Sequence, residues 1–156
     1  MKKEAVIPKD EFKTKAERCA FEIINFLIRH KLWQDTCVYV NGKRYGCYDG
    51  EHYQYDNTWE CVFREDNIDP KKYIEYSSDF LTMSFEGPFY DVINYTYPVK
   101  HCDKLMAEFD DICKKYGKYH ELGYAWSLGL YDLWYCIKIF LNFGYFANVQ
   151  TKQNVL

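Results

Sequence analysis

The chain has 156 residues, which is the usual size of one domain, and 48% of them are hydrophobic, which is enough to close a single core without disulfides or metal ions. Its net charge of −3 at pH 7 is the opposite of the strongly basic balance that proteins use to hold nucleic-acid phosphates. We therefore expect a single domain, residues 1–156, for which direct binding to nucleic acid is disfavoured.

The acidic groups are concentrated in the middle third of the chain. Residues 47–95 carry three basic and eleven acidic side chains, a charge of −8, whereas the two flanks together carry +5. The chain also has 16 Tyr and 11 Phe, more rings than a core of this size can hold, and Tyr is common at protein interfaces. If these groups share a face, they favour a basic protein as the partner. The alternative explanation is solvated loops and Tyr-rich strands.

An amphipathic helix is predicted over residues 10–32. Its apolar residues recur at three- and four-residue spacing: Phe12, Ala16, Cys19, Ala20, Ile23 and Leu27. Acidic Asp10 and Glu11 at the start and three basic residues at positions 29–31 complement the helix dipole. Such a stripe requires an apolar surface to cover.

Residues 36–64 are predicted to form a meander of three or four antiparallel strands. Short runs rich in Val, Tyr and Cys are separated by Asn41-Gly42 and Asp49-Gly50, and both dipeptides accept the positive φ angles of two-residue hairpin turns. The alternation from Trp59 onward indicates a further strand. The polar segment 64–79 is expected to be a loop with one helical turn after Asp69.

The stretch LTMSFEGPFYDVINY, residues 81–95, changes from strand-like alternation to helical spacing at Gly87-Pro88. We predict a strand over residues 81–86 and a short helix that begins at Pro88, because proline already has a helical φ angle. Glu86 then lies beside a helix N-terminus, where the dipole stabilises a carboxylate. A binding or capping role therefore suits Glu86 better than proton donation.

A second amphipathic helix is predicted over residues 98–117, with Pro98 in its first turn and Gly117 at its end. Residues 119–131 then alternate large and small side chains, which predicts a strand with one bulky and one nearly bare face, on which a helix is expected to pack. A helix that runs into the apolar tract 133–147 is the competing assignment. The expected fold is α+β: an antiparallel sheet (hairpin meander 36–64 plus strands 81–86 and 119–131) packed on one face by helices 10–32 and 98–117.

The sequence has no motif for a metal, a nucleotide or a catalytic serine. It contains no CxxC or HxxxH pair for zinc, no GxGxxG or GxxxxGK[ST] for phosphate, and no GxSxG. We therefore expect no cofactor and no metal site.

A small enzyme, a hydrolase or transferase, is the alternative to a binding protein. A Cys nucleophile with a His base meets in space rather than in sequence, and the candidates are His52, His101 or His120 with Cys47, Cys61 or Cys102. An acid and base pair would come from Glu51, Glu60, Glu65, Asp66 or Glu86. Burial of the Cys residues among apolar neighbours would remove the main support for this alternative.

The sequence favours a cytoplasmic protein. The first residues lack the apolar run of a secretory signal, and the Cys residues form an odd set of seven without close pairs, which is typical of reduced thiols. The tract 133–147 is shorter than the roughly 20 residues that a membrane-spanning helix needs and contains Lys138. We expect no membrane segment.

These observations favour a non-enzymatic interaction or inhibitor protein that binds a basic protein surface, such as a nuclease or another nucleic-acid-binding protein. The expected partner-binding residues are the acidic and Tyr residues of the middle segment: Asp49, Glu51, Tyr53, Tyr55, Asp56, Glu60, Glu65, Asp66 and Glu86. In size and composition the chain is similar to phage and mobile-element inhibitors of host nucleases, of the anti-restriction and anti-CRISPR type, although the likeness covers no specific motif. A homodimer built on the apolar region 119–147 is a third possibility.

Overall fold

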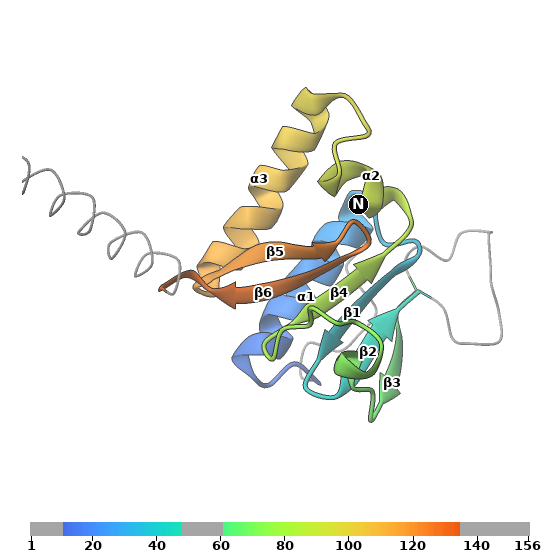
Figure 1. Cartoon of the computed structure of the whole chain (residues 1–156), viewed down its shortest axis with the longest axis vertical. Coiled ribbons are helices and arrows are strands. Elements are labelled where there is room, and N and C mark those ends of the chain that lie inside the picture. Colours follow the sequence, from blue (N-terminus) through green and yellow to red (C-terminus); the bar gives the residue numbers. More distant parts are fainter. Residues whose placement is uncertain (1–10, 48–60, 135–156) are drawn as a thin grey trace, which may run out of the picture.

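The chain folds into an α+β structure, seen in a computed structural model that describes residues 11–47 and 61–134 (Figure 1). Its six strands form one antiparallel sheet in the order β3-β2-β1-β4-β6-β5. The helices are α1 (Lys15–Arg29), α2 (Pro88–Ile93), α3 (Val99–Lys115) and the short 3-10 helix η3 (Pro70–Lys72). The strands are β1 (Thr36–Val40), β2 (Lys43–Gly46), β3 (Phe63–Asp66), β4 (Thr82–Phe85), β5 (Lys118–Tyr124) and β6 (Ser127–Asp132). The predicted fold class is confirmed.

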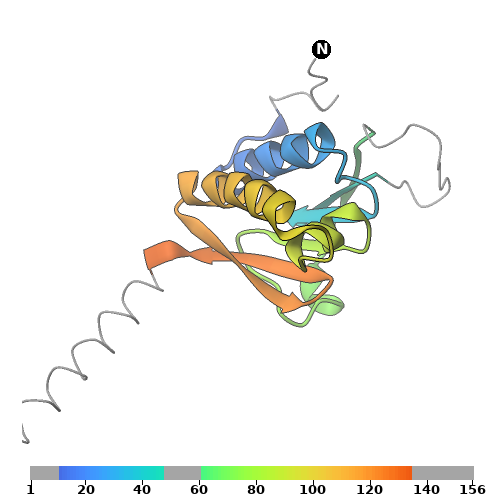
Figure 2. The ribbon, with the colours of Figure 1, turned by 90° about the horizontal axis from the view of Figure 1, so that it is seen from above.

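Helices α1 and α3 lie side by side on one face of the sheet, as Figure 2 shows from above. Their rings meet where Phe26 of α1 packs on Phe109 of α3, with centroids 5.9 Å apart, and both side chains are fully buried. Phe89 of α2 joins the same core at 5.4 Å from Phe109. The same core contains Leu128 and Leu130 of β6, Met83 and Phe85 of β4, and Leu81, which directly precedes β4. Burying these side chains drives the two-layer packing, at about 1.5–3 kcal/mol for each fully buried large side chain.

Helix α1 begins later than predicted. Its N-cap is Thr14, whose hydroxyl accepts a hydrogen bond from the Glu17 backbone N–H at 3.1 Å, while the Glu17 carboxylate accepts one from the Thr14 N–H at 2.9 Å. This reciprocal capping box satisfies two backbone donors at the helix end. The helix therefore starts at Lys15, after Glu11, and the predicted start at residue 10 was wrong; Asp10 itself lies outside the described residues.

The β1–β2 hairpin turns at Asn41-Gly42, as predicted. Both residues have positive φ angles, 49° and 70°, which is the requirement of a type I′ turn. Asp49-Gly50 and the start of the predicted strand at Trp59 lie outside the described residues. Strand β3 begins at Phe63 and pairs with β2, so Glu65 lies opposite Arg44.

Residues 119–131 form a hairpin of two strands, β5 and β6, and not the single predicted strand. The alternation persists along most of the hairpin because paired residues share a face and have numbers of the same parity, as in Leu122 opposite Leu128 and His120 opposite Leu130. Next to the turn the register shifts between Leu122 and Tyr124, so that Tyr124 pairs with Ser127. The turn at Ala125-Trp126 contains neither Gly nor Asn, so no turn signal separated the two strands.

The turn from β4 into α2 has the predicted form, with Gly87 as N-cap and Pro88 in the first helical turn. The glycine is required by a close approach of the backbone, because a Cβ atom at position 87 would lie 2.1 Å from the Gln34 carbonyl oxygen.

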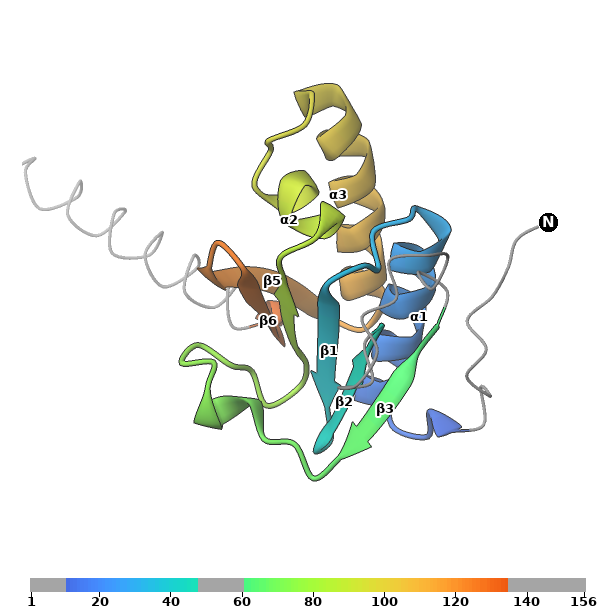
Figure 3. The same cartoon turned by 90° about the vertical axis from the view of Figure 1, so that its right-hand side faces the viewer.

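The second face of the sheet is partly covered by residues 67–81, which cross it on the side opposite α1 (Figure 3). This segment contains η3, whose N-cap Asp69 starts the predicted helical turn. Ile74 is buried, and Tyr73 packs edge-on against Tyr39 of β1 with ring centroids 5.8 Å apart. The hydroxyl of Ser78 donates a hydrogen bond to the Leu130 carbonyl of β6. We call this the open face, because no helix longer than η3 covers it in the described ranges.

Candidate functional site

The predicted partner-binding residues are only partly described by the structure. Asp49, Glu51, Tyr53, Tyr55, Asp56 and Glu60 lie outside the described residues. Of the other three, Glu65 and Asp66 lie on the edge strand β3, whereas the Glu86 backbone N–H donates to the Asp35 carbonyl at the opposite end of β1. The fold does not bring Glu86 together with Glu65 and Asp66.

The charges of Glu65 and Asp66 are balanced by neighbouring arginines. Arg44 Nε lies 2.6 Å from Glu65 Oε2 across the β2–β3 ladder, and Arg64 Nη2 lies 3.0 Å from Asp66 Oδ2. Arg64 also contacts Glu11 at 3.1 Å. These ion pairs reduce the net negative potential of β3, so the acidic character predicted for this strand is local and weak.

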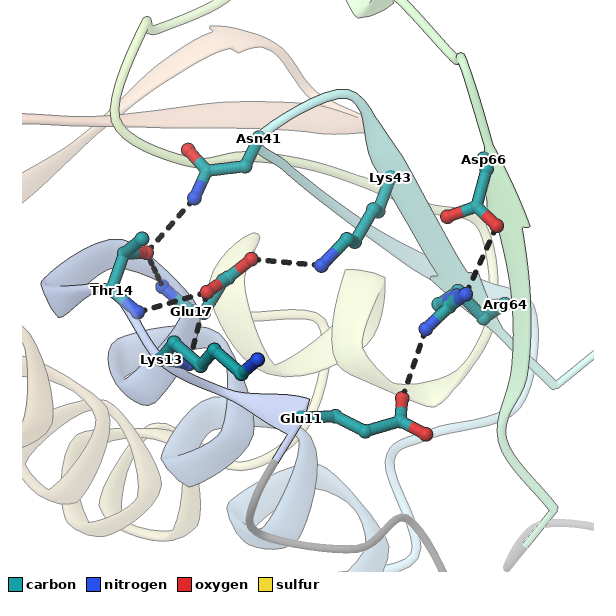
Figure 4. Close-up of polar contacts among 8 residues, drawn as sticks. All are labelled: Glu11, Lys13, Thr14, Glu17, Asn41, Lys43, Arg64 and Asp66. Atoms are coloured by element: carbon teal, nitrogen blue, oxygen red, sulfur yellow. Dashed lines mark hydrogen bonds and ion pairs between the residues drawn. The ribbon is translucent and has the colours of Figure 1, made fainter.

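A polar cluster joins the start of α1 to the β1–β2 hairpin (Figure 4). The Glu17 carboxylate is at its centre: it accepts hydrogen bonds from the Lys13 and Thr14 backbone N–H groups at 3.0 and 2.9 Å and from Lys43 Nζ at 2.9 Å. Asn41 Nδ2 donates to the Thr14 hydroxyl at 2.9 Å. A shallow cavity of about 330 Å³ adjoins the cluster, lined by Glu11, Lys13, Glu17, Lys43 and Arg64.

The Glu17 cluster has a structural role. Burial by itself would raise the pKa of this carboxyl, but the hydrogen bond from the Thr14 backbone and the bond and charge of Lys43 lower it to about 2. Glu17 is therefore ionised throughout the physiological range and cannot act as a general acid or base near pH 7. Because Lys43 belongs to β2 and Thr14 to the cap of α1, the cluster fixes the helix against the hairpin.

Five aromatic residues gather on the open face along the β5–β6 hairpin, a surface that we call the aromatic face. They are Tyr76, Tyr119, Tyr124, Trp126 and Tyr131. Three of them form a row: Tyr124 stacks on Trp126 at 5.5 Å with planes 7° apart, and Tyr76 packs against Tyr124 at 5.3 Å. Tyr76 and Tyr124 are 51% and 40% exposed, so this row presents ring surface to solvent.

Two exposed carboxylates border the aromatic face, Glu75 at one end and Glu121 at the other. The Tyr124 hydroxyl donates to Glu75 Oε2, and this hydrogen bond raises the pKa of Tyr124. The Tyr119 hydroxyl donates to Glu121 Oε2 at 3.3 Å. Unlike Glu65 and Asp66, neither carboxylate forms an ion pair with a Lys, Arg or His residue in the described part of the chain. Their negative charge is therefore available to a partner.

The glycines of β5 and β6 explain how the aromatic face is built. A Cβ atom at Gly123 would lie 2.6 Å from the Tyr76 Cβ, and one at Gly129 would lie 2.9 Å from the Tyr131 ring and 3.0 Å from the Ser78 Cβ. The nearly bare side of the hairpin is thus occupied by the 67–81 segment and by Tyr131. The expectation that a helix packs there was wrong.

Of the three candidate cysteines, Cys47 and Cys61 are partly buried and Cys102 is buried. Burial raises the pKa of Cys19 to about 12, and it also raises the pKa of Cys37, Cys47 and Cys113. A protonated thiol is a poor nucleophile. The Sγ of Cys102 donates to the Tyr97 carbonyl at 3.6 Å.

Two histidines are bound to carboxylates of α3. His30 Nε2 lies 2.8 Å from Glu108 Oε2, and His120 Nδ1 lies 2.9 Å from Asp110 Oδ1. His120 was a candidate base for a thiol, but its partner is this carboxylate. His101 is exposed beside the Tyr97 ring, and His52 lies outside the described residues.

Two further kinds of site are absent from the described part of the chain. Across residues 11–47 and 61–134, no three His, Cys, Asp or Glu side chains come together in a group that could hold a metal ion. None of the described helices is both long enough and apolar enough to span a bilayer.

Comparison with known proteins does not assign the chain to a family. No family model matches it, and no curated protein or solved structure shows significant similarity to it.

Two parts of the site were missed by sequence reasoning. The capping box had a local signal, since Thr14 and Glu17 have the T-x-x-E spacing. The aromatic face had none, because Glu75 and Tyr76 belong to a loop about fifty residues from the β5–β6 hairpin, and only the sheet order brings them together.

Proposed function

We propose that the chain is a non-enzymatic interaction protein that binds a basic protein surface through acidic and Tyr-rich groups. The observation that carries this proposal is the aromatic face, where exposed rings lie next to two carboxylates that have no cationic partner among residues 11–47 and 61–134. This surface extends the predicted acidic segment, since Glu75 and Tyr76 belong to the middle third and Glu121 and Tyr124 lie beyond it.

The composition of the aromatic face is that of a binding surface. Tyr and Trp are enriched among the residues that contribute most to interfaces, because they bury a large area and lose little conformational entropy. Unpaired carboxylates at the rim attract cationic partners and discriminate against acidic ones. The alternative, an enzyme with a Cys nucleophile, has no comparable support, because burial raises the pKa of Cys47.

The class of partner is inferred from charge. We propose a cytoplasmic nuclease or another nucleic-acid-handling enzyme, because such proteins have basic channels in which carboxylates of an inhibitor take the place of phosphates. An inhibitor of this kind from a phage or mobile element would act against a restriction or CRISPR nuclease. Glu75 and Glu121 are the carboxylates that favour a partner of this charge.

Capture of partners from a lysate of the host cells tests this proposal. The immobilised wild-type chain is compared with Glu75→Lys/Glu121→Lys, and with the control Asp103→Lys/Asp111→Lys, which changes the net charge equally but alters exposed acids of α3. We expect the wild type and the control to retain basic proteins that elute with salt, and the Glu75/Glu121 variant to lose them.

Equal retention of basic proteins by both double variants would contradict the proposal. Equal loss would contradict it too, because it would show a dependence on net charge and not on this surface.

Inhibition of DNA or RNA cleavage by the captured enzyme then tests the inhibitor role. Sedimentation of the purified chain shows whether its partner is a second copy, as the alternative of a homodimer requires.

A further inference from the structure

The row of Tyr76, Tyr124 and Trp126, together with the Glu75 carboxylate, has the chemistry of a receptor for a planar cation. The rings are in contact, at 5.3 and 5.5 Å between centroids, so they form one aromatic cluster and not three separate rings. Glu75 Oε2 already accepts the Tyr124 hydroxyl, which places the carboxylate at the border of this surface and leaves Oε1 for an incoming donor.

The fold holds this row in place before any partner arrives. Gly123 lets the 67–81 segment approach β5 closely, because a Cβ atom at position 123 would lie 2.6 Å from the Tyr76 Cβ. The turn that carries Trp126 is anchored at both of its residues: the Trp126 carbonyl accepts from the Phe85 N–H at 2.8 Å, and the Ala125 carbonyl accepts from Asn94 Nδ2 at 2.8 Å. A receptor that is already ordered loses less entropy on binding than a flexible one.

An arginine side chain fits these groups better than a lysine does. The guanidinium group is planar and weakly hydrated, so it stacks on aromatic rings while its N–H groups bond to a carboxylate in the same plane. The lysine ammonium is a compact, strongly hydrated charge that gains less from a flat aromatic surface. The carboxylate excludes anions, and the exposed ring surface favours a group that is both cationic and polarisable.

We infer that Glu75, Tyr76, Tyr124 and Trp126 bind an arginine side chain of the partner protein. This inference rests on the proposed function and specifies the contact that the partner would make. The guanidinium group lies over the ring row and pairs with Glu75. Glu121, at the other end of the aromatic face, contributes long-range attraction and no direct contact to this arginine.

Titration of the full chain with three short peptides tests the inference. The peptides are acetyl-Gly-Arg-Arg-Gly-amide, the same peptide with Lys in place of Arg, and the same peptide with uncharged citrulline. Binding is followed by ¹⁵N NMR at low salt, with the Trp126 indole N–H assigned from a Trp126→Phe variant. We expect the arginine peptide to shift the Trp126 indole signal, the lysine peptide to bind several-fold more weakly, and the citrulline peptide to cause no shift.

Two variants of matched charge complete the test. Glu75→Gln removes the carboxylate and keeps the size of the side chain, and we expect it to weaken arginine-peptide binding about tenfold, the loss of one charged contact. Glu121→Gln removes an equal charge and should weaken binding less than threefold. The backbone spectrum of each variant shows that the fold is intact.

Three results would overturn the inference: equal affinities for the arginine and lysine peptides, equal effects of the two variants, or shifts that map away from Tyr124 and Trp126. None of these results depends on the lysate experiment. They would refute arginine binding by the ring row without refuting the proposed acidic interface. If the arginine peptide binds but the lysate experiment shows no difference between the Glu75/Glu121 variant and its control, the proposed function is refuted and arginine binding is not.

Discussion

The substitution Glu17→Gln tests how the α1 cap is held to the β1–β2 hairpin. Glu17 is only 4% exposed and accepts three hydrogen bonds, two from backbone N–H groups and one from the Lys43 ammonium. A fall in the carboxyl pKa from 4.5 to about 2 on folding corresponds to roughly 3 kcal/mol of stability at neutral pH. Glutamine keeps the size of the side chain but removes the charge and leaves Lys43 without its carboxylate.

We expect Glu17→Gln to lower the free energy of unfolding by about 3 kcal/mol at pH 7, measured by urea denaturation followed by far-UV circular dichroism. For a domain of this size, such a loss corresponds to a fall in the melting temperature of about 6–12 °C. Asp111→Asn is the matched control, because its side chain is 79% exposed and its contact with Lys114 is 3.8 Å long. The control should change stability by less than about 0.5 kcal/mol.

The effect of Glu17→Gln on stability should depend on pH. Because the folded-state pKa of Glu17 is lower than the unfolded value, the carboxylate stabilises the fold fully above about pH 4.5, and this contribution is lost as the pH falls towards 2. The stability difference between wild type and Glu17→Gln should therefore shrink as the pH falls from 5 to 2.5. A difference that is below 1 kcal/mol at pH 7, or that does not change with pH, would refute the reasoning.

Two further predictions concern packing. Gly87→Ala should destabilise the fold by about 1–3 kcal/mol in the same denaturation assay, because its Cβ would meet the Gln34 carbonyl at 2.1 Å. Gly42→Ala should destabilise the fold by about 1 kcal/mol, because its Cβ meets no atom within 4 Å but its φ angle is 70°. A smaller loss for Gly87→Ala than for Gly42→Ala would contradict the close approach. The thiols of Cys19 and Cys113 should react with a disulfide reagent at pH 8 only as fast as the chain unfolds, because both are buried out of reach of the reagent and burial also raises their pKa. Reaction at the rate of a free thiol would show that they are accessible.

Much of the architecture was determined by local patterns in the sequence. The apolar stripes of the two long helices, the Asn41-Gly42 turn and the Gly87-Pro88 boundary each depend on residues that lie within a few positions of one another. Such features reflect backbone conformation and the period of one element, and both can be read without knowledge of the rest of the chain.

The candidate site was decided by the tertiary structure. Glu65 is balanced by Arg44 because β3 pairs with β2 in one register, and a shift of one residue would have separated this pair. The aromatic face depends on a loop that crosses the sheet and on glycines that admit it. Strand order and loop path result from the packing of the whole core, so the sequence by itself determined that acidic and aromatic residues are abundant, and only the fold determined which of them share a surface.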